Sequence, residues 1–77
     1  MKEIVVLGSG CTKCEKTADA IRTIAAELAI PVSLSKETSA EAIMLAGVMR
    51  TPAVMVDGQL VHSGSIPHRQ DIEAWLS

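Results

Sequence analysis

The chain has 77 residues, enough for one small domain with a modest core. A formal net charge of −2 without a basic cluster argues against nucleic-acid binding, and a single tryptophan as the only aromatic residue means that the core must be aliphatic. No apolar stretch approaches the ~20 residues that a membrane-spanning helix needs.

The first predicted element is a strand over residues 3–7, a continuous apolar run typical of a strand that is covered on both faces. Gly8 and Gly10 follow it, and we expect them to allow a sharp turn between strand and helix. The next element is a predicted helix over residues 11–29, which Pro31 ends. Cys11 and Cys14, the only two cysteines of the chain, lie at its start.

The spacing of the two cysteines predicts redox chemistry. Side chains three apart share one side of a helix, with Cβ atoms roughly 5–6 Å apart. A disulfide needs about 3.5–4.5 Å, so a small shift forms or breaks the bond. The helix N-terminus should lower the pKa of Cys11, with Lys13 and Gly10 as weaker candidates for the same effect. Cys14 belongs to an apolar stripe with residues 18, 21, 25 and 28, so we expect Cys11 to be the nucleophile and Cys14 the resolving thiol.

Residues 32–35 alternate between apolar and polar side chains, which predicts an edge strand that pairs parallel with the first through a right-handed crossover. Thr38 and Glu41 form a capping box that opens a short helix through about Ala46, and Gly47 ends this helix.

The last third of the chain predicts a hairpin followed by a helix. Asp57-Gly58 stands between the apolar runs 53–56 and 59–62, a strong signal for a two-residue turn. Pro52 is placed at a strand start, where its missing N–H does least harm. The final helix should bury Ile72, Trp75 and Leu76.

The chain resembles the thioredoxin fold, and more narrowly the small thioredoxin-like or glutaredoxin-like redox-active disulfide proteins of archaea and bacteria. The matching pieces are Gly10-Cys11-x-x-Cys14, Gly47-Val48-x-x-Thr51-Pro52, Val56-Asp57-Gly58 and Gly64-x-x-Pro67, in this order. The resemblance implies a single α/β domain over 1–77 with the element order βαβαββα and a four-stranded mixed sheet, order 2-1-3-4, flanked by helices. It also implies that Thr51-Pro52 is a cis bond facing the cysteines, and that both residues bind substrate by strand addition.

Two departures from the family pattern limit what the resemblance implies. Gly10 stands where thioredoxin has an aromatic residue, and Thr12-Lys13 replaces its Gly-Pro pair. The recycling partner of thioredoxin or glutaredoxin is therefore not carried over.

These features predict a thiol–disulfide oxidoreductase that acts on protein disulfides. We expect it to be cytoplasmic, because no secretory signal precedes the first strand. We also expect a monomer without a nucleic-acid or membrane partner. It should need no cofactor beyond its own Cys11–Cys14 disulfide, and a separate reductase should recycle it. A zinc site would need four ligands, and no pattern recruits His62 or His68.

Two alternatives stay open. A copper(I) carrier also holds two cysteines at a strand–helix junction, although such carriers typically have the order βαββαβ. A redox-sensing binding module would change its partner affinity on oxidation without turnover.

Overall fold

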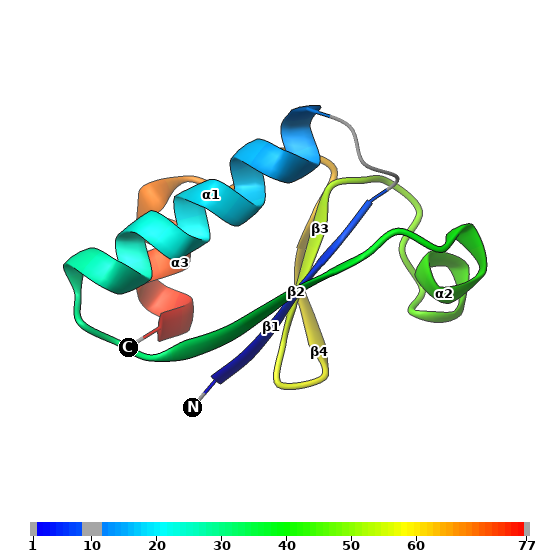
Figure 1. Ribbon diagram of the computed structural model, residues 1–77. Coiled ribbons are helices and arrows are strands. Elements are labelled where there is room, and N and C mark those ends of the chain that lie inside the picture. Colours follow the sequence, from blue (N-terminus) through cyan, green and yellow to red (C-terminus); the bar gives the residue numbers. More distant parts are fainter. Residues whose placement is uncertain (1, 9–11, 77) are drawn as a thin grey trace.

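The described part of the chain forms three helices and four strands, which follow one another in the order βαβαββα (Figure 1). The structure, a computed structural model, describes residues 2–8 and 12–76. The elements are β1 (Lys2–Leu7), α1 (Thr12–Glu27), β2 (Val32–Glu37), α2 (Ala40–Leu45), β3 (Ala53–Val56), β4 (Gln59–Ser63) and α3 (Arg69–Leu76).

The strands form one mixed sheet in the order β2-β1-β3-β4, which confirms the predicted fold class. β1 pairs with β2 in parallel, from Lys2 opposite Val32 to Leu7 opposite Glu37. β1 with β3 and β3 with β4 pair antiparallel. β2 is an edge strand as predicted, but it continues to Glu37 rather than ending at Ser35.

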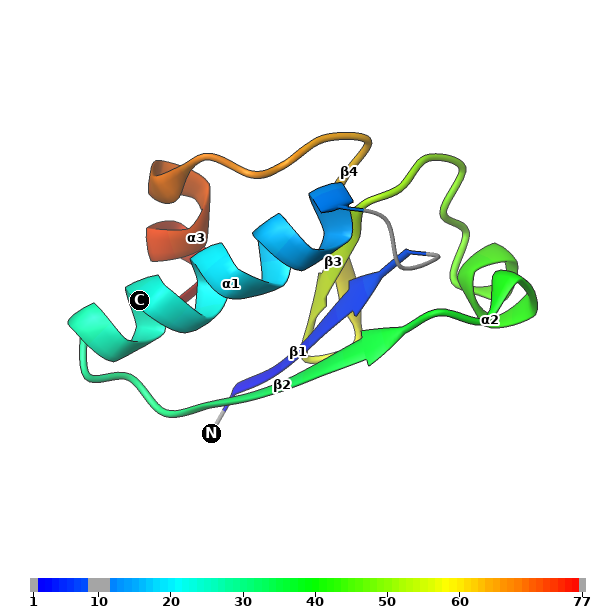
Figure 2. The same cartoon turned by 45° about the horizontal axis from the view of Figure 1, so that its top comes forward.

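Helices cover both faces of the sheet. α1 and α3 lie on one face and α2 lies on the other (Figure 2). Ile4 and Val6 of β1 point into the cluster under α1 and α3. Leu7 points to the other face and packs with Ile43 and Val48. The alternation along β1 thus confirms that this strand is apolar on both sides because both sides are covered.

Helix α1 ends two residues earlier than predicted. Ala29 has a φ of 56°, and its N–H donates to Ala26 O while the N–H of Ile30 donates to Ala25 O. These two bonds form a Schellman motif, in which alanine occupies the left-handed position that usually holds glycine. Leu28, predicted as the last residue of the buried stripe, is instead 41% exposed because it lies just beyond the last residue of α1.

The N-cap of α2 was predicted one residue too early. Ser39, not Thr38, is the cap, and its Oγ accepts from the N–H of Ala42 at 3.4 Å. Glu37 Oε1 in turn accepts from the N–H of Ser39 at 3.0 Å. At the other end Gly47 has a φ of 80° and ends the helix as predicted.

The predicted hairpin between β3 and β4 is confirmed. Asp57 and Gly58 have φ values of 50° and 83°, the pair of positive angles that a tight hairpin turn requires. A register shift after Val54, which pairs with His62 while Met55 pairs with Leu60, leaves Val61 as the extra residue of a bulge.

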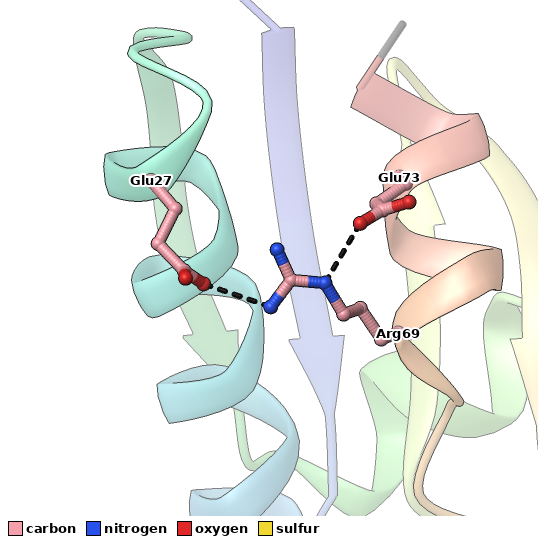
Figure 3. Close-up of polar contacts among 3 residues, drawn as sticks. All are labelled: Glu27, Arg69 and Glu73. Atoms are coloured by element: carbon pink, nitrogen blue, oxygen red, sulfur yellow. Dashed lines mark hydrogen bonds and ion pairs between the residues drawn. The ribbon is translucent and has the colours of Figure 1, made fainter.

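Arg69 joins the two helices that share a face (Figure 3). Its Nε donates to Glu73 of the same helix at 2.7 Å, and its Nη1 donates to Glu27 of α1 at 2.9 Å. The hydrogen bond to Glu73, and after it the hydrogen bond to Glu27, raise the pKa of Arg69 above its usual value. Among the described residues, no helix combines the length and the apolar character needed to cross a membrane.

Candidate active site

The predicted resolving cysteine lies at the end of the sheet where β1 leads toward α1. Cys14 occupies the first turn of α1 on the side that faces the core, and it is 4% exposed. This burial agrees with its predicted place on the apolar stripe. Cys11 and Gly10, the other two predicted residues of this segment, lie outside the described residues.

Gly8 makes room for the Cys14 sulfur. A Cβ added to Gly8 would overlap Cys14 Sγ and would lie 3.2 Å from Cys14 Cβ. The residue is buried, and its N–H donates to Glu37 O at 2.9 Å, so the backbone is held where it is. Gly8 was expected to supply a sharp turn. Its φ is not in the left-handed region, so its contribution is the missing side chain.

The cis peptide bond that the family resemblance implied is confirmed at Thr51-Pro52. A Cβ added to Gly8, which would overlap the Cys14 sulfur, would also lie 3.7 Å from Thr51 Cβ. Three residues from separate parts of the chain, Gly8, Cys14 and Thr51, therefore meet at one place. Pro52 is buried, and its carbonyl accepts from the N–H of Gly64 at 2.9 Å.

Thr51 presents unused backbone groups next to the sulfur. It is exposed, and within residues 2–8 and 12–76 neither its N–H nor its C=O takes part in a hydrogen bond. A backbone with an open donor and acceptor at a sheet end suits pairing with another extended segment.

Thr17 is a buried polar residue that the sequence reasoning missed. It is fully buried, and its Oγ1 donates to Lys13 O at 2.8 Å, which satisfies the hydroxyl inside the helix. The signal in the sequence is its place between Cys14 and Ala18 on the buried stripe. Lys13 itself is exposed, as expected for a residue beside that stripe.

This fold, with a cysteine in the first turn of α1 beside a cis-proline, defines a thioredoxin-like protein. A family model described as a thioredoxin domain matches residues 2–77, and the chain belongs to this family. It is similar to a thioredoxin of Methanothermobacter thermautotrophicus, with 30% identity over 77 residues that span all of both chains. It is also similar to a thioredoxin of Methanocaldococcus jannaschii, with 33% identity over 76 residues, which cover 99% of this chain and 87% of that protein.

The family assignment and the observed topology help to distinguish the predicted oxidoreductase from the predicted copper(I) carrier. The element order ends with α3 and contains the cis-proline, whereas the predicted copper(I) carrier would have the order βαββαβ. The fold therefore favours the oxidoreductase over the metal carrier.

Proposed function

We propose that the chain is a thiol–disulfide oxidoreductase that uses Cys11 and Cys14 to reduce disulfides of protein substrates. Membership in the thioredoxin family supports a thiol–disulfide oxidoreductase role in general terms. The observation that carries the specific proposal is the position of Cys14, nearly buried against Gly8 and beside Thr51. A sulfur with so little exposure suits an attack on a neighbouring sulfur better than a first attack on a large substrate.

The proposed reaction has two exchange steps. The Cys11 thiolate attacks one sulfur of the substrate disulfide, that S–S bond breaks, and the other substrate sulfur leaves as a thiolate and takes up a proton. Cys14 then loses its proton and attacks the Cys11 sulfur, which releases the second substrate thiolate. Two electrons pass to the substrate, and the product is the Cys11–Cys14 disulfide. A separate dithiol reductase returns this disulfide to the dithiol, so the chain needs no cofactor of its own.

Thr51 and Pro52 hold the substrate segment in this proposal. The open N–H and C=O of Thr51 pair with an extended stretch of substrate, which brings its disulfide over the sulfur of the attacking cysteine. The buried Pro52 keeps the neighbouring backbone in place through its bond with Gly64. Gly10 and Lys13 are proposed to favour the thiolate of Cys11, through the helix start and through positive charge respectively.

Trapping of mixed disulfides tests the assigned roles. We expect Cys14→Ser to accumulate mixed disulfides with a protein substrate, because the second step is blocked, and dithiothreitol should release them. Cys11→Ser should accumulate none. Equal trapping by the two variants would contradict the roles. Wild-type protein supplied with dithiothreitol should also reduce insulin over many turnovers, whereas a redox sensor would be oxidised once and stop.

A further inference from the structure

The surface next to the proposed active site carries three basic side chains, Lys13, Lys16 and Arg50, which we call the basic frame. All three are exposed, and within the part of the chain that the structure describes none of them forms an ion pair. This contrasts with Arg22 and Arg69, each of which is paired with a carboxylate. The net charge of the chain is −2, so the positive charge of this surface is local.

The two lysines lie on the flank of α1 that faces α3. Residues 13, 16, 20 and 27 are spaced so that they share one helix face. Glu27 on that face contacts Arg69 of α3, which fixes the direction of the whole flank. Near the start of α1, the same flank borders the segment 63–68 that connects β4 to α3 (Figure 2).

Arg50 lies on the side of the site that holds the cis-proline. It directly precedes Thr51, and its Cβ and Cδ both lie 3.6 Å from the position that a Cβ on Gly64 would take. Gly64 also donates its N–H to Pro52 O, so the stem of Arg50 lies against the start of the segment 63–68, next to the cis-proline.

The acidic residues nearest in sequence do not neutralise this frame. Glu15 lies on the flank of α1 that also carries Arg22. Asp19, three residues after Lys16, is paired with Arg22 at 2.9 Å. Glu37 lies on the edge strand β2, where its carboxylate accepts from the N–H of Ser39. Glu41 lies in the first turn of α2, on the far face of the sheet.

We propose that the basic frame selects substrate segments that carry acidic side chains next to the reactive disulfide. The inference rests on the proposed function and specifies its substrate class. An extended segment paired with Thr51 passes between Arg50 and the lysine flank of α1, so aspartate or glutamate on either side of the substrate cysteine meets a cation. Exposed charges act mainly on encounter rate and orientation, and salt weakens them.

The test uses three synthetic peptides of one sequence, each with a single intramolecular disulfide flanked by two Asp, two Asn or two Lys residues. Pre-reduced protein is mixed with each peptide, and the second-order rate constant is measured by acid quench and chromatography. Acidic neighbours also change the intrinsic reactivity of the peptide disulfide. Each rate constant is therefore divided by that of dithiothreitol with the same peptide.

At low salt we expect the normalised rate constant to be roughly 5–10-fold higher for the Asp peptide than for the Asn peptide, and lowest for the Lys peptide. In 1 M NaCl the three normalised rate constants should become equal. Arg50→Gln should reduce the preference and Arg50→Glu should reverse it. Lys2→Gln is the matched control. It removes the same charge at the opposite end of β1, six residues and about 20 Å from Gly8, beyond the reach of a screened charge.

The outcomes separate the inference from the function on which it rests. Equal normalised rate constants for the three peptides would overturn the inference and leave the oxidoreductase standing. An equal loss of preference in Lys2→Gln and Arg50→Gln would overturn it too, because the effect would then come from net charge. Failure to reduce any of the peptides would overturn both the function and the inference.

Discussion

At the scale of single residues, the position of the Cys14 sulfur depends on the absence of a side chain at Gly8. A methyl group at Gly8 would overlap Cys14 Sγ, and the backbone of Gly8 is tied to Glu37, so neither partner can move freely. We predict that Gly8→Ala lowers the free energy of unfolding by about 1–3 kcal/mol, as overpacking of a core does. It should also slow disulfide exchange, because the sulfur is displaced. Urea denaturation and single-turnover reduction of a peptide disulfide measure the two effects.

A double-mutant cycle tests whether the overlap with the Cys14 sulfur causes the loss of stability in Gly8→Ala. In a Cys14→Ala background the sulfur is gone, and the added Cβ meets the Cβ of residue 14 at 3.2 Å and Thr51 Cβ at 3.7 Å. The cost of Gly8→Ala should fall there, with a coupling of about 0.5–3 kcal/mol. Strictly additive costs would mean that Gly8 acts through something other than the sulfur.

Asp57 combines two local functions in one side chain. Its φ is 50°, its N–H donates to Glu3 O at 2.8 Å, and its Oδ1 accepts from the N–H of Glu3 at 2.9 Å. We predict that Asp57→Ala costs about 1–2 kcal/mol, from the lost hydrogen bond and from alanine in a left-handed conformation. Asp57→Asn keeps both the acceptor and the tolerance for this conformation, so its thermal midpoint should stay close to that of the wild type. An equally large loss in both variants would show that the negative charge, rather than the geometry, matters.

At the scale of elements, Arg69 holds α3 against α1. Its pKa is raised above its usual value, so its stabilising contribution is complete below the pKa of the unfolded state and is lost only as the pH rises through the higher pKa of the folded state. Salt is therefore the variable that tests this ion pair, not pH in the ordinary range. Glu27→Gln removes the contact between the helices, whereas Glu73→Gln removes only a contact within α3.

We predict that Glu27→Gln increases amide hydrogen exchange in α3 more than Glu73→Gln does, and that 1 M NaCl removes this difference. The expected shift in the thermal midpoint is a few degrees at most for either variant, because exposed ion pairs contribute little. Equal exchange in α3 for the two variants would show that apolar packing of Ile72 and Leu76 alone sets its docking.

The elements themselves follow largely from the sequence, because periodicity determines which side chains can be buried together. The burial of Cys14 was predictable in this way, whereas the parallel pairing of β1 with β2 followed from the crossover rule and the hairpin from the turn residues Asp57-Gly58. The full strand order was implied only by the family resemblance. The end of α1 was not predictable, since it depends on Ala29 adopting a conformation that its side chain disfavours. The role of Gly8 was also not predictable, because it depends on how the first turn of α1 sits over β1 in space.

At the scale of the whole molecule, the two faces of the sheet are unequally covered. The face under α1 and α3 holds a continuous cluster that includes Ile4, Ile21 and Ile72, all fully buried. The other face is covered by the six residues of α2, where Ile43 packs with Leu7 and Val48 while Met44 and Leu45 are 74% and 81% exposed. A chain of this size has a total stability of only about 4–12 kcal/mol, so a difference of this kind between the faces should be measurable.

We predict that α2 and the segment 46–50 open locally without unfolding of the rest. Few apolar contacts hold them, and regions with few such contacts open at a lower free-energy cost than the global transition. In native-state hydrogen exchange, amides of α2 should exchange faster than those of β1, β3 and the middle of α1. Ile21→Ala should cost about 2–5 kcal/mol, and Ile43→Ala should lie near the bottom of that range. Because this mobile segment leads into Thr51, its opening would let the substrate-pairing backbone adjust while Cys14 stays fixed on the well-packed face. If α2 exchanged only at the global unfolding rate, the site would be rigid on both sides.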